Sequence, residues 1–177
     1  QHGWNVTGEG SATVQSNTVF SGTQALQVTD ASASHRFAGT ESNVWVSYRL
    51  KAGRGLEPQN IPTNMAVVFY VNGDGNLCVY SNQQSVTLPV AVPEGWNRYD
   101  FHCDFTAKRW DLRLNRALVV SDFPFYGAPD AFSLLRLDGK ARGTFLDDVQ
   151  VVFVNPDRDN DGYSNDEETQ AGSNPDD

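Results

Sequence analysis

Hydrophobic and polar residues alternate along several short stretches of the chain, most regularly over residues 43–50. A period of two residues is typical of a β-strand that buries one of its faces. The face expected to lie in the core consists of Val44, Val46, Tyr48 and Leu50. The opposite face carries Trp45, Ser47 and Arg49. We therefore expect a strand with an aromatic and a cationic side chain on its non-core side.

Two further stretches, residues 96–105 and 109–114, show the same alternation. Together the three stretches predict a core that includes Val44, Val46, Tyr48, Phe101, Phe105, Trp110, Leu112 and Leu114. The polar positions of the two later stretches are Arg98, Asp100, His102, Asp104, Asp111 and Arg113. If the strands are neighbours, these polar side chains form one surface together with Trp45 and Arg49.

Shorter β-prone segments, separated by turn-forming residues, fill the rest of the first 154 residues. They cover residues 12–15, 25–29, 35–38, 66–72, 76–81, 117–121, 132–138 and 144–154. Residues 51–64 are expected to form a long loop, and Pro89 and Pro93 to frame another. Many short strands without a long helical pattern predict an all-β fold, an antiparallel jelly-roll sandwich.

The end of the chain follows a different pattern. Residues 157–168, called the acidic loop below, match the calcium-loop spacing Asp-x-Asp-x-Asp-Gly-x5-Glu. Calcium prefers several oxygen ligands gathered in a small volume, and a glycine at the sixth position permits the sharp turn. The expected ligands are Asp157, Asp159, Asp161, the backbone carbonyl of Tyr163, Asn165 and Glu168. The alternative is an acidic tail solvated by water alone, but the spacing favours the metal site.

The residues on either side of the acidic loop indicate how it is built. An apolar, β-branched segment precedes it, so the incoming helix of an EF-hand is not expected. Residues 165–171 can form a short helix that ends at Gly172. We expect two units, a β-sandwich over residues 1–154 and a calcium-binding appendage over residues 155–177.

Charge and composition exclude several classes of function. The net charge of −9 is concentrated in residues 157–177, which hold eight acidic residues and one basic residue. The preceding residues hold 14 acidic and 12 basic residues and are therefore nearly neutral. We expect no nucleic-acid binding without a basic patch, and no membrane insertion without an apolar run of ~20 residues. Cys78 and Cys103 either form a disulfide or remain buried thiols, and the sequence leaves both open.

Residues 157–175 resemble the bacterial version of the thrombospondin type 3 repeat, through the acidic loop and the Ala-Gly-Ser-Asn-Pro ending. In that family the calcium ion is structural and the repeats lie outside the cell. The resemblance therefore implies Ca²⁺ as a structural ion and a secreted or cell-surface bacterial protein. Asp176 and Asp177 resemble the start of a further acidic segment, which implies neighbouring domains in a longer polypeptide.

Residues 96–101 and 110–115 resemble parts of the concanavalin A-like, laminin G-like jelly roll. Residues 22–28 and 145–149 resemble segments of secreted bacterial carbohydrate-binding modules. In such modules a closing pair of aspartates often helps to hold a structural Ca²⁺. The resemblance implies a second metal site formed by Glu9, Asp147 and Asp148. The alternative is an acidic strand start whose carboxylates accept hydrogen bonds from nearby backbone amides.

Catalysis is less favoured than binding. Asp100, Asp104 and Asp111 could serve as a pair of glycosidase carboxylates, but the sequence shows no recognisable arrangement of nucleophile and base. Sugars present flat CH faces and many hydroxyls, so their sites combine an aromatic platform with planar polar groups. The predicted ligand-binding residues are Trp45, Arg49, Arg98, His102 and Arg113.

Arginine pairs with carboxylates and sulfates through two parallel hydrogen bonds, so several arginines on one face favour an acidic polysaccharide. We expect a non-catalytic, extracellular carbohydrate-binding module with such a glycan as its partner. One alternative is a structural or adhesive spacer domain of a large cell-surface protein. Another is a fragment of an enzyme that degrades polysaccharide.

Overall fold

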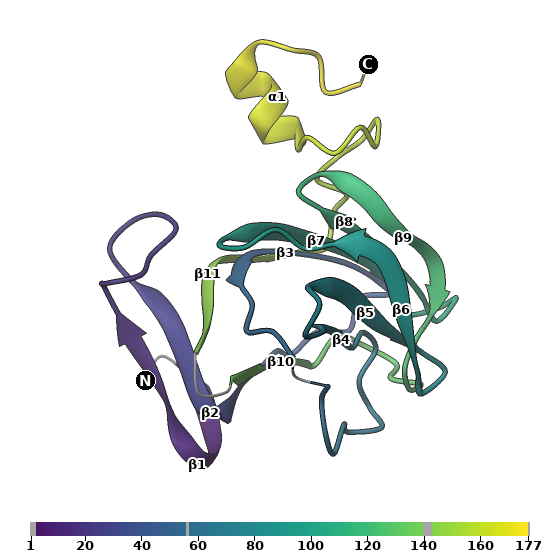
Figure 1. Cartoon of the computed structure of the whole chain (residues 1–177). Coiled ribbons are helices and arrows are strands. Elements are labelled where there is room, and N and C mark those ends of the chain that lie inside the picture. The colour runs from purple at the N-terminus through teal and green to yellow at the C-terminus, as the bar shows by residue number, and fades with distance from the viewer. Residues whose placement is uncertain (1–2, 56, 140–142, 177) are drawn as a thin grey trace.

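The computed structural model describes residues 3–55, 57–139 and 143–176. These residues form eleven β-strands and a short α-helix near the C-terminus (Figure 1). The strands of the first half are β1 (Trp4–Gln15), β2 (Ala25–Arg36), β3 (Asn43–Lys51), β4 (Phe69–Val71), β5 (Asn76–Ser81) and β6 (Gln84–Ala91). Those of the second half are β7 (Asn97–Asp104), β8 (Arg109–Leu114), β9 (Ala117–Pro124), β10 (Leu134–Gly139) and β11 (Thr144–Val152), followed by α1 (Asn165–Ala171).

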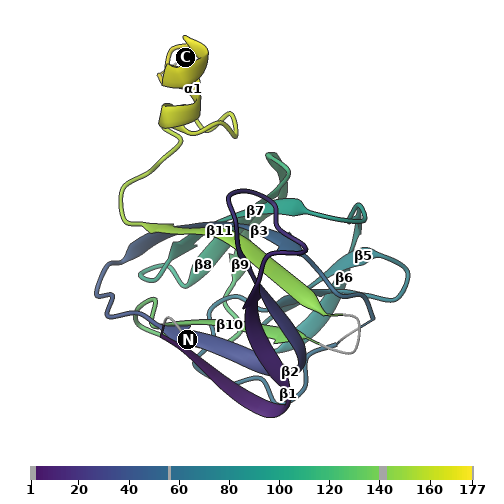
Figure 2. The same cartoon turned by 90° about the vertical axis from the view of Figure 1, so that its left-hand side faces the viewer.

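The strands pair antiparallel in two sheets. The large sheet has the order β1-β2-β11-β3-β7-β8-β9, and β10 also pairs with β2. The small sheet has the order β4-β5-β6. Figure 1 shows the small sheet and β10 packed beneath β3, β7 and β8, so the fold is an all-β sandwich. Figure 2 shows the C-terminal helix standing on the far side of the large sheet from the small one.

Strand β2 connects the two layers at one end of the sandwich. One of its edges pairs with β1, while the other pairs first with β11 and then with β10. The β1–β2 pairing contains a bulge between Gly8 and Ser11. A side chain at Gly10 would clash with the backbone carbonyl of Thr29, so this close approach requires glycine.

All eight side chains predicted for the core are buried. Phe101 joins the two layers, because its ring lies 5.6 Å from Tyr48 in the large sheet and 5.5 Å from Phe69 in the small sheet. It also lies 6.1 Å from the ring of Trp110, which is completely buried. The sandwich core therefore forms around aromatic side chains that the alternating pattern identified.

The strand predictions were correct in type and partly wrong in extent. Strands β5 and β8 and helix α1 have the expected bounds. Strands β1 and β2 are both longer than expected. In β2 the reason is that small Ala and Ser residues alternate, so no apolar pattern marks that part of the strand. Strand β6 was missed because it contains Pro89. Since β6 is an edge strand with β5 on one side only, the missing N–H of a proline is tolerated there.

Both cysteines are buried free thiols, which decides between the two alternatives that the sequence left open. Burial raises the pKa of Cys103 to about 12, so its reactive thiolate is scarce at neutral pH. We expect neither Cys78 nor Cys103 to react with Ellman's reagent at pH 8 in the folded protein. Both should react within minutes in guanidinium chloride, and rapid labelling of the folded protein would contradict the buried placement.

Candidate functional site

The candidate site lies on the outer face of the large sheet, which is the face of β3, β7 and β8 that points away from the small sheet. Exposure alternates along these strands, so the predicted polar positions do share this face. Strands β3 and β7 are direct neighbours, as are β7 and β8. The pairing places Trp45 opposite His102, and His102 opposite Asp111.

Trp45 and His102 form a rigid aromatic platform on the outer face. Their rings are stacked, with centroids 4.7 Å apart and planes inclined by 17°. The His102 ring is held on both sides, since Nδ1 lies 3.2 Å from Asp111 Oδ2 and Nε2 lies 3.0 Å from Asn43 Oδ1. Asp111 in turn accepts a 2.8 Å hydrogen bond from the backbone N–H of Asp122. The indole therefore rests on a fixed imidazole.

A cleft of about 840 Å³ separates this face from the C-terminal segment. The sheet side of the cleft contains Trp45, Ser47, Arg98, Asp100, His102, Asp111, Arg113 and Gln150. The opposite side is formed by the acidic loop and the start of α1, including Asp157, Asn160, Tyr163, Ser164 and Asp166. The candidate ligand-binding face and the candidate metal loop thus belong to one structural feature.

The acidic loop gathers three carboxylates in a small volume. Each of Asp157, Asp159 and Asp161 offers one oxygen, and these oxygens lie within 4.8 Å of one another. Gly162 turns the chain with φ of 99°, and its N–H donates to Asp157 Oδ2 at 3.0 Å. Among the residues that the structure describes, this is the one group of three or more His, Cys, Asp or Glu side chains close enough to share a metal ion.

Three carboxylate oxygens of the acidic loop are buried without a hydrogen-bond partner. They are Asp157 Oδ1, Asp159 Oδ2 and Glu168 Oε2. Glu168 is only 4% exposed, and burial together with the charges of Asp159 and Asp161 raises its pKa. Buried carboxylate oxygens without donors are costly unless a cation satisfies them. The donor set is all oxygen, so the loop fits a hard divalent ion.

Two more of the expected calcium ligands, Tyr163 and Asn165, lie where the acidic loop meets helix α1. Helix α1 begins at the N-cap Ser164, where Glu167 completes a capping box, and ends at the left-handed Gly172. Asn165 Oδ1 accepts a 3.1 Å hydrogen bond from the backbone N–H of Arg158 and thereby closes the loop. The Tyr163 side chain is exposed, with the Arg116 guanidinium 4.3 Å from its ring centroid.

Arginines of the sandwich hold the acidic loop in place. Arg98 Nη1 and Arg116 Nη2 both donate to Glu167 Oε1, at 2.6 and 3.0 Å. Although burial opposes ionisation of Glu167, the Ser164 N–H and the charge of Arg98 lower its pKa to about 2. Arg113 Nη2 donates to the backbone and side-chain oxygens of Asn160 at 2.6 and 2.7 Å. Two predicted ligand-binding arginines, Arg98 and Arg113, are thus engaged within the protein.

The structure does not bring Glu9 together with Asp147 and Asp148. Glu9 lies in the bulge of β1, whereas the aspartates lie at an irregularity of β11 opposite β3. Asp147 Oδ2 accepts hydrogen bonds from the backbone N–H groups of Phe20 and Ser21 at 2.8 and 3.2 Å. Asp148 Oδ1 accepts from the Ser21 hydroxyl at 2.6 Å. This is the arrangement given above as the alternative to a second metal site.

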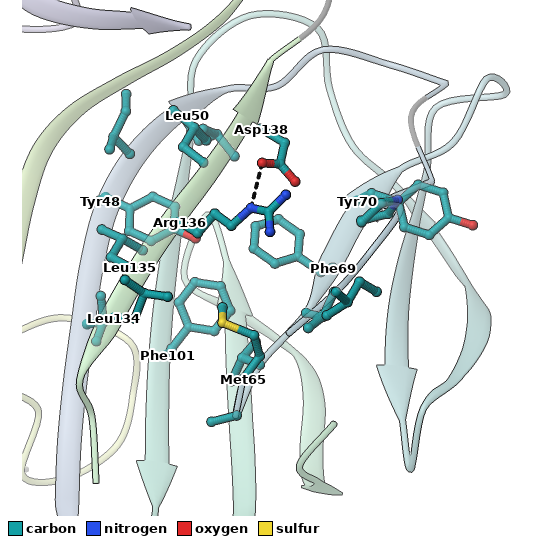
Figure 3. Close-up of a pocket in the computed structure, with 18 of the residues that line it drawn as sticks. Tyr48, Leu50, Met65, Phe69, Tyr70, Phe101, Leu134, Leu135, Arg136 and Asp138 are labelled. Atoms are coloured by element: carbon teal, nitrogen blue, oxygen red, sulfur yellow. Dashed lines mark hydrogen bonds and ion pairs between the residues drawn. The ribbon is translucent and has the colours of Figure 1, made fainter. Parts of the chain in front are cut away.

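A second, smaller cavity of about 200 Å³ lies inside the sandwich (Figure 3). It occurs where β4 and β10, which do not pair with each other, leave the second layer open. Apolar side chains such as Tyr48, Phe69 and Phe101 line it, and Figure 3 shows the Arg136–Asp138 ion pair beside it. None of the predicted site residues lines this cavity, so we assign it to core packing.

No family model matches this chain, and no curated protein sequence matches it. Its fold does match solved structures. One is a sialidase, with a TM-score of 0.61 and 12% identity over 89% of this chain; the chain spans only 17% of that protein. A second is the endo-β-1,4-glucuronan lyase from the fungus Trichoderma reesei, with a TM-score of 0.54 and 16% identity, covering 88% of this chain and 93% of the lyase.

A third match is domain 4 of AbnA, an extracellular GH43 arabinanase from Geobacillus stearothermophilus, solved in complex with arabinotriose. The TM-score is 0.51, with 15% identity over 84% of this chain and 81% of that one. The fold is a jelly roll. At these identities the likeness establishes architecture alone. Within the described ranges, no helix is long and apolar enough to cross a membrane.

Proposed function

We propose that the cleft between the outer face and the acidic loop binds a carbohydrate chain without cleaving it. The observation that carries this proposal is the Trp45–His102 stack, a fixed pair of aromatic rings that lines a cleft with polar walls. A pyranose or furanose ring stacks its CH face on such a surface while its hydroxyls bond to groups around it. Asp111, Ser47 and Gln150 line the same cleft and provide donors and acceptors.

The structural neighbours support this class of ligand. A sialidase, a glucuronan lyase and an arabinanase domain with bound arabinotriose all concern carbohydrate. We favour binding over catalysis because the carboxylates on the sheet side of the cleft already have partners. Asp100 accepts from Arg98 at 2.8 Å, and Asp111 is bound to His102 and the Asp122 amide. A general acid, in contrast, needs a carboxyl group free to reach the scissile bond.

The acidic loop supplies a structural ion site in this proposal. Asp157, Asp159, Asp161, the Tyr163 carbonyl, Asn165 and Glu168 would hold Ca²⁺ within a thrombospondin type 3-like repeat over residues 155–177. The ion would neutralise the crowded carboxylates and fix the loop, which forms one wall of the cleft. The sandwich over residues 1–154 would carry the glycan contacts. Such calcium modules and free polysaccharides both occur outside the cell, so we propose a secreted or cell-surface location.

Affinity gel electrophoresis tests the binding proposal. The probes are neutral arabinan, xylan and hydroxyethylcellulose, and anionic polygalacturonate, alginate and glucuronan, each with and without EGTA. We expect at least one probe to retard the wild type, Trp45→Ala to abolish the retardation, and EGTA to weaken it. Because Trp45 lies outside the core, its truncation should lower Tm far less than a core truncation does.

Trp4→Ala is the matched control, since Trp4 also packs against a histidine, His35, but lies on strand β1, which contributes no residue to the cleft. It should keep the retardation. If no probe retards the wild type and Trp45→Ala lowers Tm strongly, the domain is a spacer and the binding proposal is wrong. Release of new reducing ends from a retained probe would instead indicate the enzyme alternative.

A further inference from the structure

The side chains on the outer face of β3 continue beyond the cleft. After Trp45 and Ser47 it presents Arg49 and Lys51, all partly exposed on the same side of the strand. Arg49 lies directly opposite Arg98, whose side chain lines the cleft. Four residues of strand separate Trp45 from Arg49, which corresponds to ~13 Å. A ligand several sugar residues long that extends from the platform along β3 can therefore reach Arg49.

An exposed aromatic ring is fixed beside Arg49. Phe20 is 43% exposed, yet the loop that carries it is held by the hydrogen bonds of its backbone and of Ser21 to Asp147 and Asp148. The Arg49 guanidinium lies 4.4 Å from the Phe20 ring centroid. A large apolar ring held rigidly in contact with water is a feature that binding sites use.

Two more aromatic rings extend this surface. The ring of Trp96 lies 6.2 Å from that of Phe20 and 6.4 Å from that of Phe145. Lys51 Nζ lies 5.3 Å from the Phe145 ring centroid. We call these five residues, Phe20, Arg49, Lys51, Trp96 and Phe145, the aromatic–cation cluster. It joins segments far apart in the sequence, so no local motif marks it.

The cations of this cluster differ from the other basic residues of the outer face. Arg98, Arg113 and Arg116 all have carboxylate partners within 4 Å. In the described part of the chain, neither Arg49 nor Lys51 forms an ion pair. Three neighbouring carboxylates are engaged by other groups. Asp147, which pairs with Arg49 across β11 and β3, and Asp148 accept hydrogen bonds from the Phe20 loop, and Asp100 accepts from Arg98.

Arg49 is half-buried, and burial together with the neighbouring charge of Arg98 lowers its pKa. The charges of Asp100 and Asp148 oppose this shift without forming an ion pair with Arg49. An anion from outside the protein that pairs directly with this partly desolvated cation would therefore be favourable. A guanidinium in particular suits a planar carboxylate, which it binds through two parallel N–H groups.

We propose that the aromatic–cation cluster is a second subsite, which binds an anionic sugar residue of the same polysaccharide chain that the cleft holds. Arg49 and Lys51 bind the carboxylate of a uronic acid or a sulfate ester, while Phe20 and Trp96 contact the sugar ring. This rests on the proposed function of the cleft. It also places the acidic-glycan specificity at Arg49 and Lys51, because Arg98 and Arg113 are occupied by the acidic loop.

Affinity electrophoresis with chemically matched probes tests the second subsite. Polygalacturonate is compared with its methyl-esterified form, and carboxymethylcellulose with hydroxyethylcellulose, so each pair shares a backbone and differs in charge. We expect the wild type to prefer the anionic member. Arg49→Gln should weaken retention on that member about tenfold or more, as expected for the loss of a charge-assisted hydrogen bond. Phe20→Ala should weaken retention on it as well.

Arg36→Gln is the matched control, because Arg36 is an exposed arginine on β2 at the edge facing β10 and its replacement changes the net charge equally. It should retain binding. If Trp45→Ala abolishes retention while Arg49→Gln and Phe20→Ala leave it unchanged, the cleft binds glycan and the second subsite is wrong. If no probe of either panel retards the wild type, the proposed function and the second subsite both fail.

Discussion

Replacing Phe101 by alanine should destabilise the protein by ~3–5 kcal/mol, which is a large part of the ~5–15 kcal/mol that typically separates folded and unfolded states. Phe101 is 5% exposed and packs against Tyr48, Phe69 and Trp110, so its removal leaves a void between the two layers. For a chain of this length the loss corresponds to a fall in Tm of roughly 6–20 °C.

Chemical denaturation and a thermal scan of Phe101→Ala measure this effect directly. Leu118→Ala serves as the comparison, since Leu118 is 51% exposed and its truncation should change the free energy of unfolding by less than about 0.5 kcal/mol. An equal loss of unfolding free energy in the two variants would show that Phe101 does not join the two layers as described.

Replacing Glu168 by glutamine, or Asp161 by alanine, should abolish measurable Ca²⁺ binding. Calorimetry of the wild type is expected to give one site with a dissociation constant of about 10⁻⁴–10⁻³ M, the range typical of extracellular calcium modules. Glu168 matters most because it is buried with an oxygen that has no donor in the protein. At 100 times the dissociation constant, Ca²⁺ should stabilise the wild type by about 2.7 kcal/mol, and the variants by nothing.

Asp166→Asn is the control for the calcium prediction. Asp166 is exposed in the first turn of α1 and lies outside the proposed ligand set, so its replacement removes one negative charge near the loop without removing a ligand. It should bind Ca²⁺ with a similar affinity. A heat of binding that survives in both Glu168→Gln and Asp161→Ala would refute the acidic loop as a calcium site.

The sandwich core could be predicted because burial of one strand face leaves a period of two in the sequence. That signal placed Val46, Phe101 and Leu112 in the core and Trp45 and His102 on the opposite face. This period of two is not recognisable where a strand consists largely of small residues, or where an edge strand contains a proline. Strand β2, with alternating Ala and Ser, and β6, with Pro89, are the two examples.

The turn of the acidic loop and helix α1 were predictable for a different reason, since tight turns and helix caps depend on residues close together in the sequence. The bounds of α1 and the role of Gly172 followed from this. The docking of the acidic loop onto the sandwich could not be predicted in this way, because the contacts of Glu167 with Arg98 and Arg116 join residues 51 or more positions apart. The same limit explains why the contacts of Arg98 and Arg113 with the acidic loop were not predicted, and why the aromatic–cation cluster was not recognised.

The four tryptophans of the chain allow the most direct test of the cleft as a glycan site, because each reports on a different place. Trp45 lies in the cleft, Trp96 in the aromatic–cation cluster, Trp4 on β1 and Trp110 in the core. We would record the indole N–H resonances of ¹⁵N-labelled protein during titration with oligogalacturonate and, separately, with arabino-oligosaccharide. We expect either sugar to shift the Trp45 resonance and to leave those of Trp4 and Trp110 in place. The anionic sugar should also shift the Trp96 resonance. If the Trp45 resonance is unchanged with both sugars, or if only the Trp4 resonance shifts, the cleft is not the glycan site.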